Sequence, residues 1–91
     1  MARAKDEGYA VVVKWMKRRG FEVGPGSRFG AETYGQADNL RVCIDPFAGV
    51  TIVAFEGQPG RSLVRFSMEV PRNVPVKVAL ATLKAAYASR W

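Results

Sequence analysis

The sequence predicts an α+β fold of two layers, in which two helices pack on one face of a three-stranded antiparallel meander, in the order αβββα. Three observations indicate this fold. Apolar residues recur with helical spacing near both ends of the chain, and the middle carries apolar or alternating runs bounded by turn residues. A chain of 91 residues has room for one small core, so residues 1–91 are expected to form a single domain.

The first helix is predicted over residues 6–19, where one face is apolar at positions i, i+3, i+4 and i+7. The residues of this stripe are Tyr9, Val12, Val13 and Met16. Cations at Lys17 to Arg19 suit the negative end of the helix dipole, and Gly20 can end the helix. Residues 24–38 are polar, contain glycines and show no periodicity, so they are predicted as a long loop that can be mobile.

Three strands are predicted over Leu40 to Asp45, Val50 to Glu56 and Ser62 to Val70. Pro and Gly mark turns at residues 45–49 and 57–60. Because both connections are short, adjacent strands are expected to be antiparallel.

Alternation along the strands assigns side chains to the two faces of the sheet. The helix-facing set is predicted to be Leu40, Val42, Ile44, Val64, Phe66 and Met68. The opposite face then holds an apolar centre with a charged rim, which is typical of a protein interface. The candidate interface residues are Arg41, Val53, Phe55, Leu63 and Arg65. An alternative is that the 24–38 loop folds back and covers this face within the same chain.

A second helix is predicted after Pro71 to Pro75 and runs to the end of the chain. Its apolar stripe consists of Val76, Leu80, Leu83 and Tyr87. Lys77 and Lys84 lie on a separate, slim basic face with small residues between them.

The residue types restrict the chemistry. There is no histidine and one cysteine, Cys43, so the chain lacks the commonest general base and the means to form an internal disulfide or a thiolate metal site. No catalytic residue, metal site or cofactor is expected. The apolar runs are too short for a membrane span, so the protein is predicted to be soluble and cytoplasmic, with no membrane partner.

The net charge of +6 is concentrated at the ends, since residues 1–20 and 71–91 each carry +4 and residues 21–70 carry −2. This distribution predicts a small binding module for a polyanion, foremost a nucleic acid. The candidate phosphate-binding residues are Lys14, Lys17, Arg18, Arg72, Lys77 and Lys84. Trp15 and Tyr9 could stack on bases. The plainer alternative is that these cations are a solvated surface.

Protein binding is the second hypothesis, as a homodimer or as a small modulator of a larger protein, through the interface residues named above. Two likenesses accompany these hypotheses. The αβββα order resembles the double-stranded-RNA-binding domain in topology, although Arg72, Lys77 and Lys84 stand where that family has a dense lysine run. The strand, proline and helix from Phe66 to Leu80 are similar to the ending of small uncharacterised proteins from actinobacteria and their phages, which implies an accessory or phage protein.

Overall fold

The computed structural model describes residues 2–26, 32–56 and 63–91, with side chains from Tyr9 onward. Two helices and five strands follow in the order α1 Ala2–Arg18, β1 Glu22–Pro25, β2 Thr33–Ala37, β3 Leu40–Asp45, β4 Gly49–Glu56, β5 Leu63–Pro71 and α2 Val76–Ala88. The strands form one sheet in the order β1-β2-β3-β4-β5, and each pairs antiparallel with its neighbour in the chain.

The predicted α+β class is confirmed, but the sheet is larger than the predicted three-stranded meander. Residues 24–38, predicted as a loop, include the end of β1 and all of β2. The αβββα order is therefore wrong for this chain, and with it the topological likeness to the double-stranded-RNA-binding domain. The predicted turn at residues 57–60 lies outside the described residues.

Gly35 allows α1 to pack closely on β2, and it also weakens the sequence pattern by which this strand could be predicted. A side chain at this position would place its Cβ 2.9 Å from the Sδ of Met16, so the missing side chain lets α1 approach the sheet. Glycine weakens strand propensity, and the short segment Thr33–Ala37 lacks an apolar alternation. Tertiary packing against α1 and pairing with β3 therefore decide this strand.

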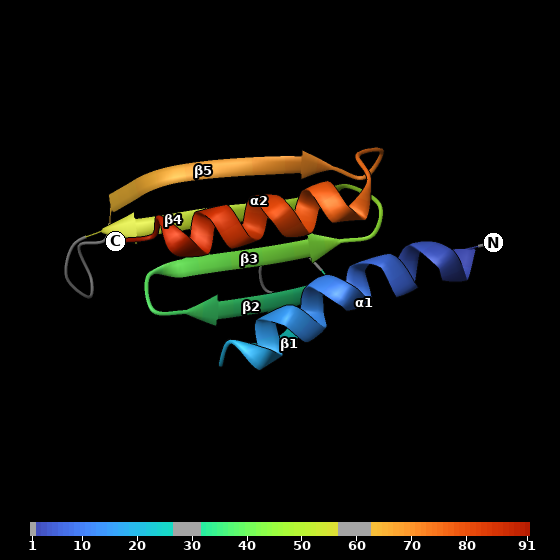
Figure 1. Ribbon diagram of the computed structural model, residues 1–91, viewed down its shortest axis with the longest axis horizontal. Helices are drawn as coiled ribbons and strands as arrows, with labels where there is room; N and C mark the ends of the chain where they lie inside the picture. The colour runs from blue at the N-terminus through green and yellow to red at the C-terminus, as the bar shows by residue number, and fades with distance from the viewer. Residues whose placement is uncertain (1, 27–31, 57–62) are drawn as a thin grey trace.

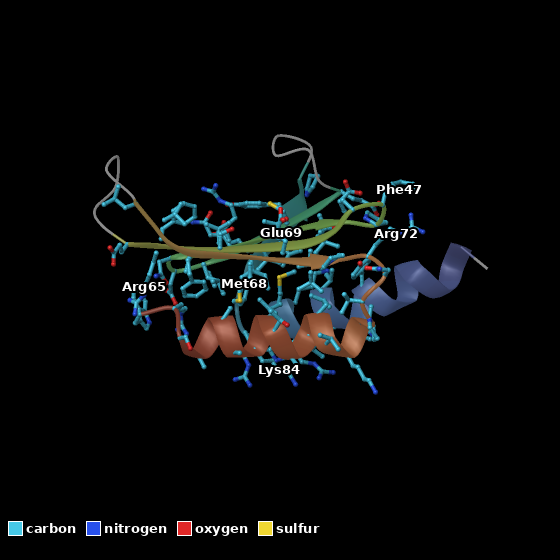
Figure 2. All side chains as sticks on the ribbon, turned by 90° about the horizontal axis from the view of Figure 1, so that it is seen from above. Phe47, Arg65, Met68, Glu69, Arg72 and Lys84 are labelled. Carbon is cyan, nitrogen blue, oxygen red and sulfur yellow. The ribbon has the colours of Figure 1, made fainter. Side chains whose placement is uncertain are left out.

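Both helices lie on one face of the sheet, as predicted (Figure 1). Figure 2 shows the same two layers from above, with α2 running beneath the strands and Met68 pointing between them. The core between the layers is wholly apolar among the described residues. Its members are Tyr9, Val12, Met16, Phe21, Leu40, Val42, Ile44, Val50, Ile52, Ala54, Val70, Ala79, Leu83 and Ala86.

An irregularity between β4 and β5 changes which residues face the helices. The register shifts between Ala54 and Phe55, so that Ala54 opposes Phe66 whereas Phe55 opposes Val64. Directly opposed residues project from the same face of a sheet. Val64, predicted for the core, therefore shares the face of Phe55 and is 58% exposed.

Gly49 fixes the start of β4. Its φ of 122° lies in the left-handed region, and a Cβ built there would be 2.1 Å from the carbonyl oxygen of Val70. The preceding turn is held by the backbone N–H of Phe47, which donates to Asp45 Oδ1 at 2.9 Å. The predicted turn at residues 45–49 is thus confirmed.

A clasp of polar contacts ties the end of α2 to the sheet. The Asn39 side-chain amide donates to the carbonyl oxygen of Phe55 at 2.6 Å and to that of Arg90. The Arg90 guanidinium in turn forms an ion pair with Asp38, with 3.2 Å between Nε and Oδ2. The chain end after α2 is therefore held against the β2–β3 turn and the end of β4.

Candidate nucleic-acid interface

The aromatic contact between Trp15 of α1 and Tyr87 of α2 shows how the two helices are oriented. Their rings meet edge to face, with centroids 5.5 Å apart and planes at 89°. Since side chains advance by about 100° per residue around a helix, the direction of each remaining side chain of α1 and α2 follows from its spacing from Trp15 or Tyr87. Both helices also run from right to left in Figure 1, so their C-terminal ends point the same way.

On α1, the cations fall into two groups. Lys14 and Arg18 are four residues apart and share one stripe, about 180° from the buried stripe that contains Met16. Both point to solvent beside Trp15. Lys17 is also exposed, but it lies on the flank of α1 away from Trp15 and hence away from α2.

On α2, Lys77 and Lys84 are seven residues apart and share one exposed stripe, about 60° around the helix from Tyr87. Figure 2 shows Lys84 projecting away from the sheet. The outer side of the helix layer therefore carries four of the six predicted cations around the α1–α2 contact. We call this set, Lys14, Arg18, Lys77 and Lys84, the cationic surface.

Arg72, the remaining predicted phosphate-binding residue, lies away from the cationic surface. It is exposed in the turn between β5 and α2. In Figure 2 it lies near Phe47 at the far end of the sheet and on the other side from Lys84. The structure thus brings together four of the six predicted cations and separates Arg72 and Lys17 from them.

Carboxylates are distributed in the opposite way. Neither the described side chains of Tyr9 to Arg19 nor those of Val76 to Trp91 include an aspartate or glutamate. The carboxylates among the described side chains all belong to strands and turns, at Glu22, Glu32, Asp38, Asp45, Glu56 and Glu69. Like-signed charge therefore collects on the described part of the helix layer, where neither helix supplies a carboxylate among its described side chains.

The two aromatic residues predicted to stack on bases are engaged within the protein. Tyr9 is only 8% exposed and belongs to the core. Trp15 is half-buried and packs against Tyr87, against Phe21 at 6.0 Å and beneath the Arg19 guanidinium at 5.6 Å. Both rings support the α1–sheet and α1–α2 packing.

The second candidate site, the face of the sheet opposite the helices, keeps three of its five predicted residues. The Arg41 guanidinium lies 4.7 Å from the Phe55 ring and 5.9 Å from the Tyr34 ring, and Val53 is its partner across the strand pair. Val64 joins this open face because of the register shift.

Leu63 and Arg65 leave the open face. Leu63 opposes Glu56, one position beyond Phe55, and so shares the helix side of the sheet at its edge. Arg65 occupies the irregularity itself, and Figure 2 shows it on the helix side, whereas Glu69 points from the opposite face. A regular alternation with a period of two predicts Leu63, Arg65 and Glu69 on one face of the sheet. The extra residue at the irregularity breaks this period, so the prediction fails for Leu63 and Arg65.

Cys43 lies half-buried on the open face, between Tyr34 and Thr51 in the strand register. Burial raises the pKa of its thiol above the ordinary value, and the positive charge of Arg41 opposes this only in part. The neutral thiol is therefore the favoured form at neutral pH, which makes Cys43 a weak nucleophile.

Other features of the described residues offer little chemistry. A pocket of about 220 Å³ lies between the first half of α1 and the ends of β2 and β3, and Glu32 is the one carboxylate in its lining. Within the described ranges there is no group of three or more metal-ligating side chains. No helix in the same ranges has the length and apolar content to cross a membrane.

Comparison with known proteins adds no relative. The chain matches no protein-family model, and searches of curated proteins and of solved structures find no similar chain. The geometry of the two faces of the molecule is therefore the basis for inferring a function.

Proposed function

We propose that this protein is a non-enzymatic nucleic-acid-binding module and that its cationic surface contacts backbone phosphates. The observation that supports the proposal is the separation of charge between the layers. Four of the predicted cations are exposed around the α1–α2 contact, while the described carboxylates lie on strands and turns. A surface of this kind attracts a polyanion before any specific contact forms.

Phosphate binding by these four residues would be driven by counterion release. Each phosphate neutralised on a duplex lowers the slope of log K against log salt by about 0.9, so four contacts correspond to a slope of about −3.6. Because Lys77 and Lys84 project from one continuous helix, their spacing is set before binding. Little backbone order has to be gained when the ligand arrives.

The open face supports the competing function, protein binding, less well. Arg41 lies over Phe55 and reduces the apolar area offered by that ring. Leu63 and Arg65, two of the residues that suggested an interface, do not lie on this face. Phosphate binding by the helix layer is therefore the function that we choose.

A matched pair of charge reversals tests the proposal. Lys84→Glu and Arg72→Glu change the net charge by the same amount at exposed sites on opposite sides of the molecule. We expect Lys84→Glu to weaken binding at least about tenfold and Arg72→Glu to weaken it less than about threefold, measured by fluorescence anisotropy with labelled nucleic acid at about 50 mM salt.

Circular dichroism of both variants provides the folding control. Equal losses for the two variants would mean that net charge acts without a located surface. Absence of binding by the parent protein at low salt would overturn the proposal outright.

A further inference from the structure

We infer that the ligand of the cationic surface is the sugar–phosphate backbone of a nucleic-acid duplex, bound without base stacking; this inference rests on the proposed function. Positive charge alone does not distinguish a duplex from a single strand, since both carry phosphates. The distinction comes from the aromatic residues and from the shape of α2.

Single-strand binding by a rigid protein surface ordinarily combines cations with aromatic rings on which bases stack. Next to the cationic surface, Trp15 and Tyr87 pack edge to face, and both contact Phe21, whose ring is 5.6 Å from Tyr87. The Arg90 guanidinium lies 3.9 Å from the Tyr87 ring and is itself held by Asp38. These rings are occupied by intramolecular contacts.

The strongly exposed aromatic residues of the described chain lie away from the cationic surface or beyond its end. Phe47 is 80% exposed, and Figure 2 shows it beside Arg72 at the end of the sheet. Trp91 is 68% exposed and follows the C-terminal end of α2, with the Arg90 guanidinium 5.5 Å from its ring. Among the described residues, Trp91 is thus the ring that a stacking mode would have to use.

The surface of α2 favours a rigid ligand. Lys77 and Lys84 are about 10 Å apart along the helix axis, given a rise of about 1.5 Å per residue. The exposed residues Ala81, Ala85 and Ala88 have small side chains, so a ligand can approach the helix closely. A DNA duplex presents one charge per about 1.7 Å of its axis, so this row of cations meets phosphates in any register.

The same surface has few of the side chains that read base edges. Asparagine and glutamine are absent from the described parts of both helices, and Arg18 is the one guanidinium among the four cations. Lysine ammonium groups bind phosphates as point charges, without the planar fork of a guanidinium. Binding should therefore be independent of sequence.

The test compares ligands of one length by anisotropy: a DNA duplex, an RNA duplex of the same sequence, the separate single strands, and a DNA duplex of unrelated sequence. We expect both DNA duplexes to bind equally, and at least one kind of duplex to bind at least about tenfold more tightly than the single strands. Preference for DNA or RNA identifies the source of the duplex, and either preference supports the inference.

Two variants sharpen the comparison. Ala81→Tyr places a bulky ring between Lys77 and Lys84, whereas Val78→Tyr places the same ring about 180° around α2 from Tyr87, on the flank away from α1. We expect Ala81→Tyr to weaken duplex binding at least about fivefold and Val78→Tyr to leave it within about twofold, because only the first blocks close approach.

Single strands that bind as tightly as duplexes would overturn the inference and leave phosphate binding intact. A ligand-induced quench of tryptophan fluorescence that occurs in the parent and is absent in Trp91→Ala would identify stacking on Trp91 as the cause. Failure of every nucleic acid to bind would instead overturn the proposed function. The two failures are therefore distinguishable in one set of titrations.

Discussion

The two faces of this sheet are covered in different ways. On one face, α1 and α2 seal side chains such as Ile52 completely, and the layer they form turns its cations outward. On the other face, the neighbouring residue Val53 is half-buried, and Arg41 lies over Phe55 without a helix above it. Comparison of the faces shows that the helices close the apolar core and carry lysines and arginines on their outer side, whereas the carboxylates among the described side chains lie on strands and turns. The described cations of the two helices, Lys14, Lys17, Arg18, Lys77 and Lys84, thus lie apart from the described carboxylates.

The largest expected effect comes from Gly49→Ala, which disturbs both faces at once. The new Cβ would collide with the carbonyl oxygen of Val70, a backbone atom that cannot move without shifting β5. The positive φ adds strain. We expect a loss of about 4 kcal/mol or more in the free energy of unfolding, measured by urea denaturation.

Gly24→Ala is the matched control for this substitution. Gly24 also lies in a strand, but a Cβ there has no heavy atom within 4 Å. Its expected effect is below about 1 kcal/mol in either direction. A Gly49→Ala protein as stable as Gly24→Ala would show that the β4–β5 register is not fixed at Gly49.

A smaller effect separates the two faces directly. Ile52→Ala and Val53→Ala truncate adjacent side chains of β4 that point to opposite sides of the sheet. We expect Ile52→Ala to cost about 3 kcal/mol, because it leaves a cavity under the helices, and Val53→Ala to cost about 1 kcal/mol. Thermal and urea unfolding measure both, and equal costs would mean that the open face is buried in solution, as in a complex.

The smallest effect concerns the pH dependence of Cys43. Burial raises its pKa in the folded protein above that of the unfolded chain, so folding favours the neutral thiol. The stability that this contributes is complete below the unfolded pKa and is lost as the pH rises through the folded pKa. We therefore expect the parent to lose slightly more stability than Cys43→Ala between neutral pH and about pH 10.

Comparison of the two proteins at each pH removes every contribution to stability that they share. A parent and variant with parallel pH profiles would contradict the raised pKa. Slow reaction of the folded thiol with a disulfide reagent at neutral pH provides a second readout.

The helices and the strands with clear patterns could be predicted from the sequence. Strand β3 has the predicted bounds, and Leu40, Val42 and Ile44 face the core because their alternation is regular. Strand β2 could not be predicted in this way, because Gly35 and Gln36 interrupt the apolar pattern and its stability comes from neighbours distant in the chain.

The candidate site was predicted in part for a similar reason. Helical periodicity assigned Lys77 and Lys84 to one stripe, and that assignment needs only residues of the same helix. Whether Arg72 joins them depends on the direction in which the chain leaves β5, which no local pattern encodes. The register shift beside Phe55 likewise has no signature in the alternation of Leu63 to Val70.

The connectivity of the chain has a consequence for the order of folding. Each strand of the sheet pairs with its neighbour in sequence, so the sheet can grow by successive hairpins that close short loops. The Trp15–Tyr87 contact, by contrast, joins two nearly opposite ends of the chain. Closing so long a loop carries a high entropic cost and is expected late. That contact also brings the cations of α1 beside those of α2. The complete cationic surface is therefore expected to form only when the two helices dock, at a late step of folding.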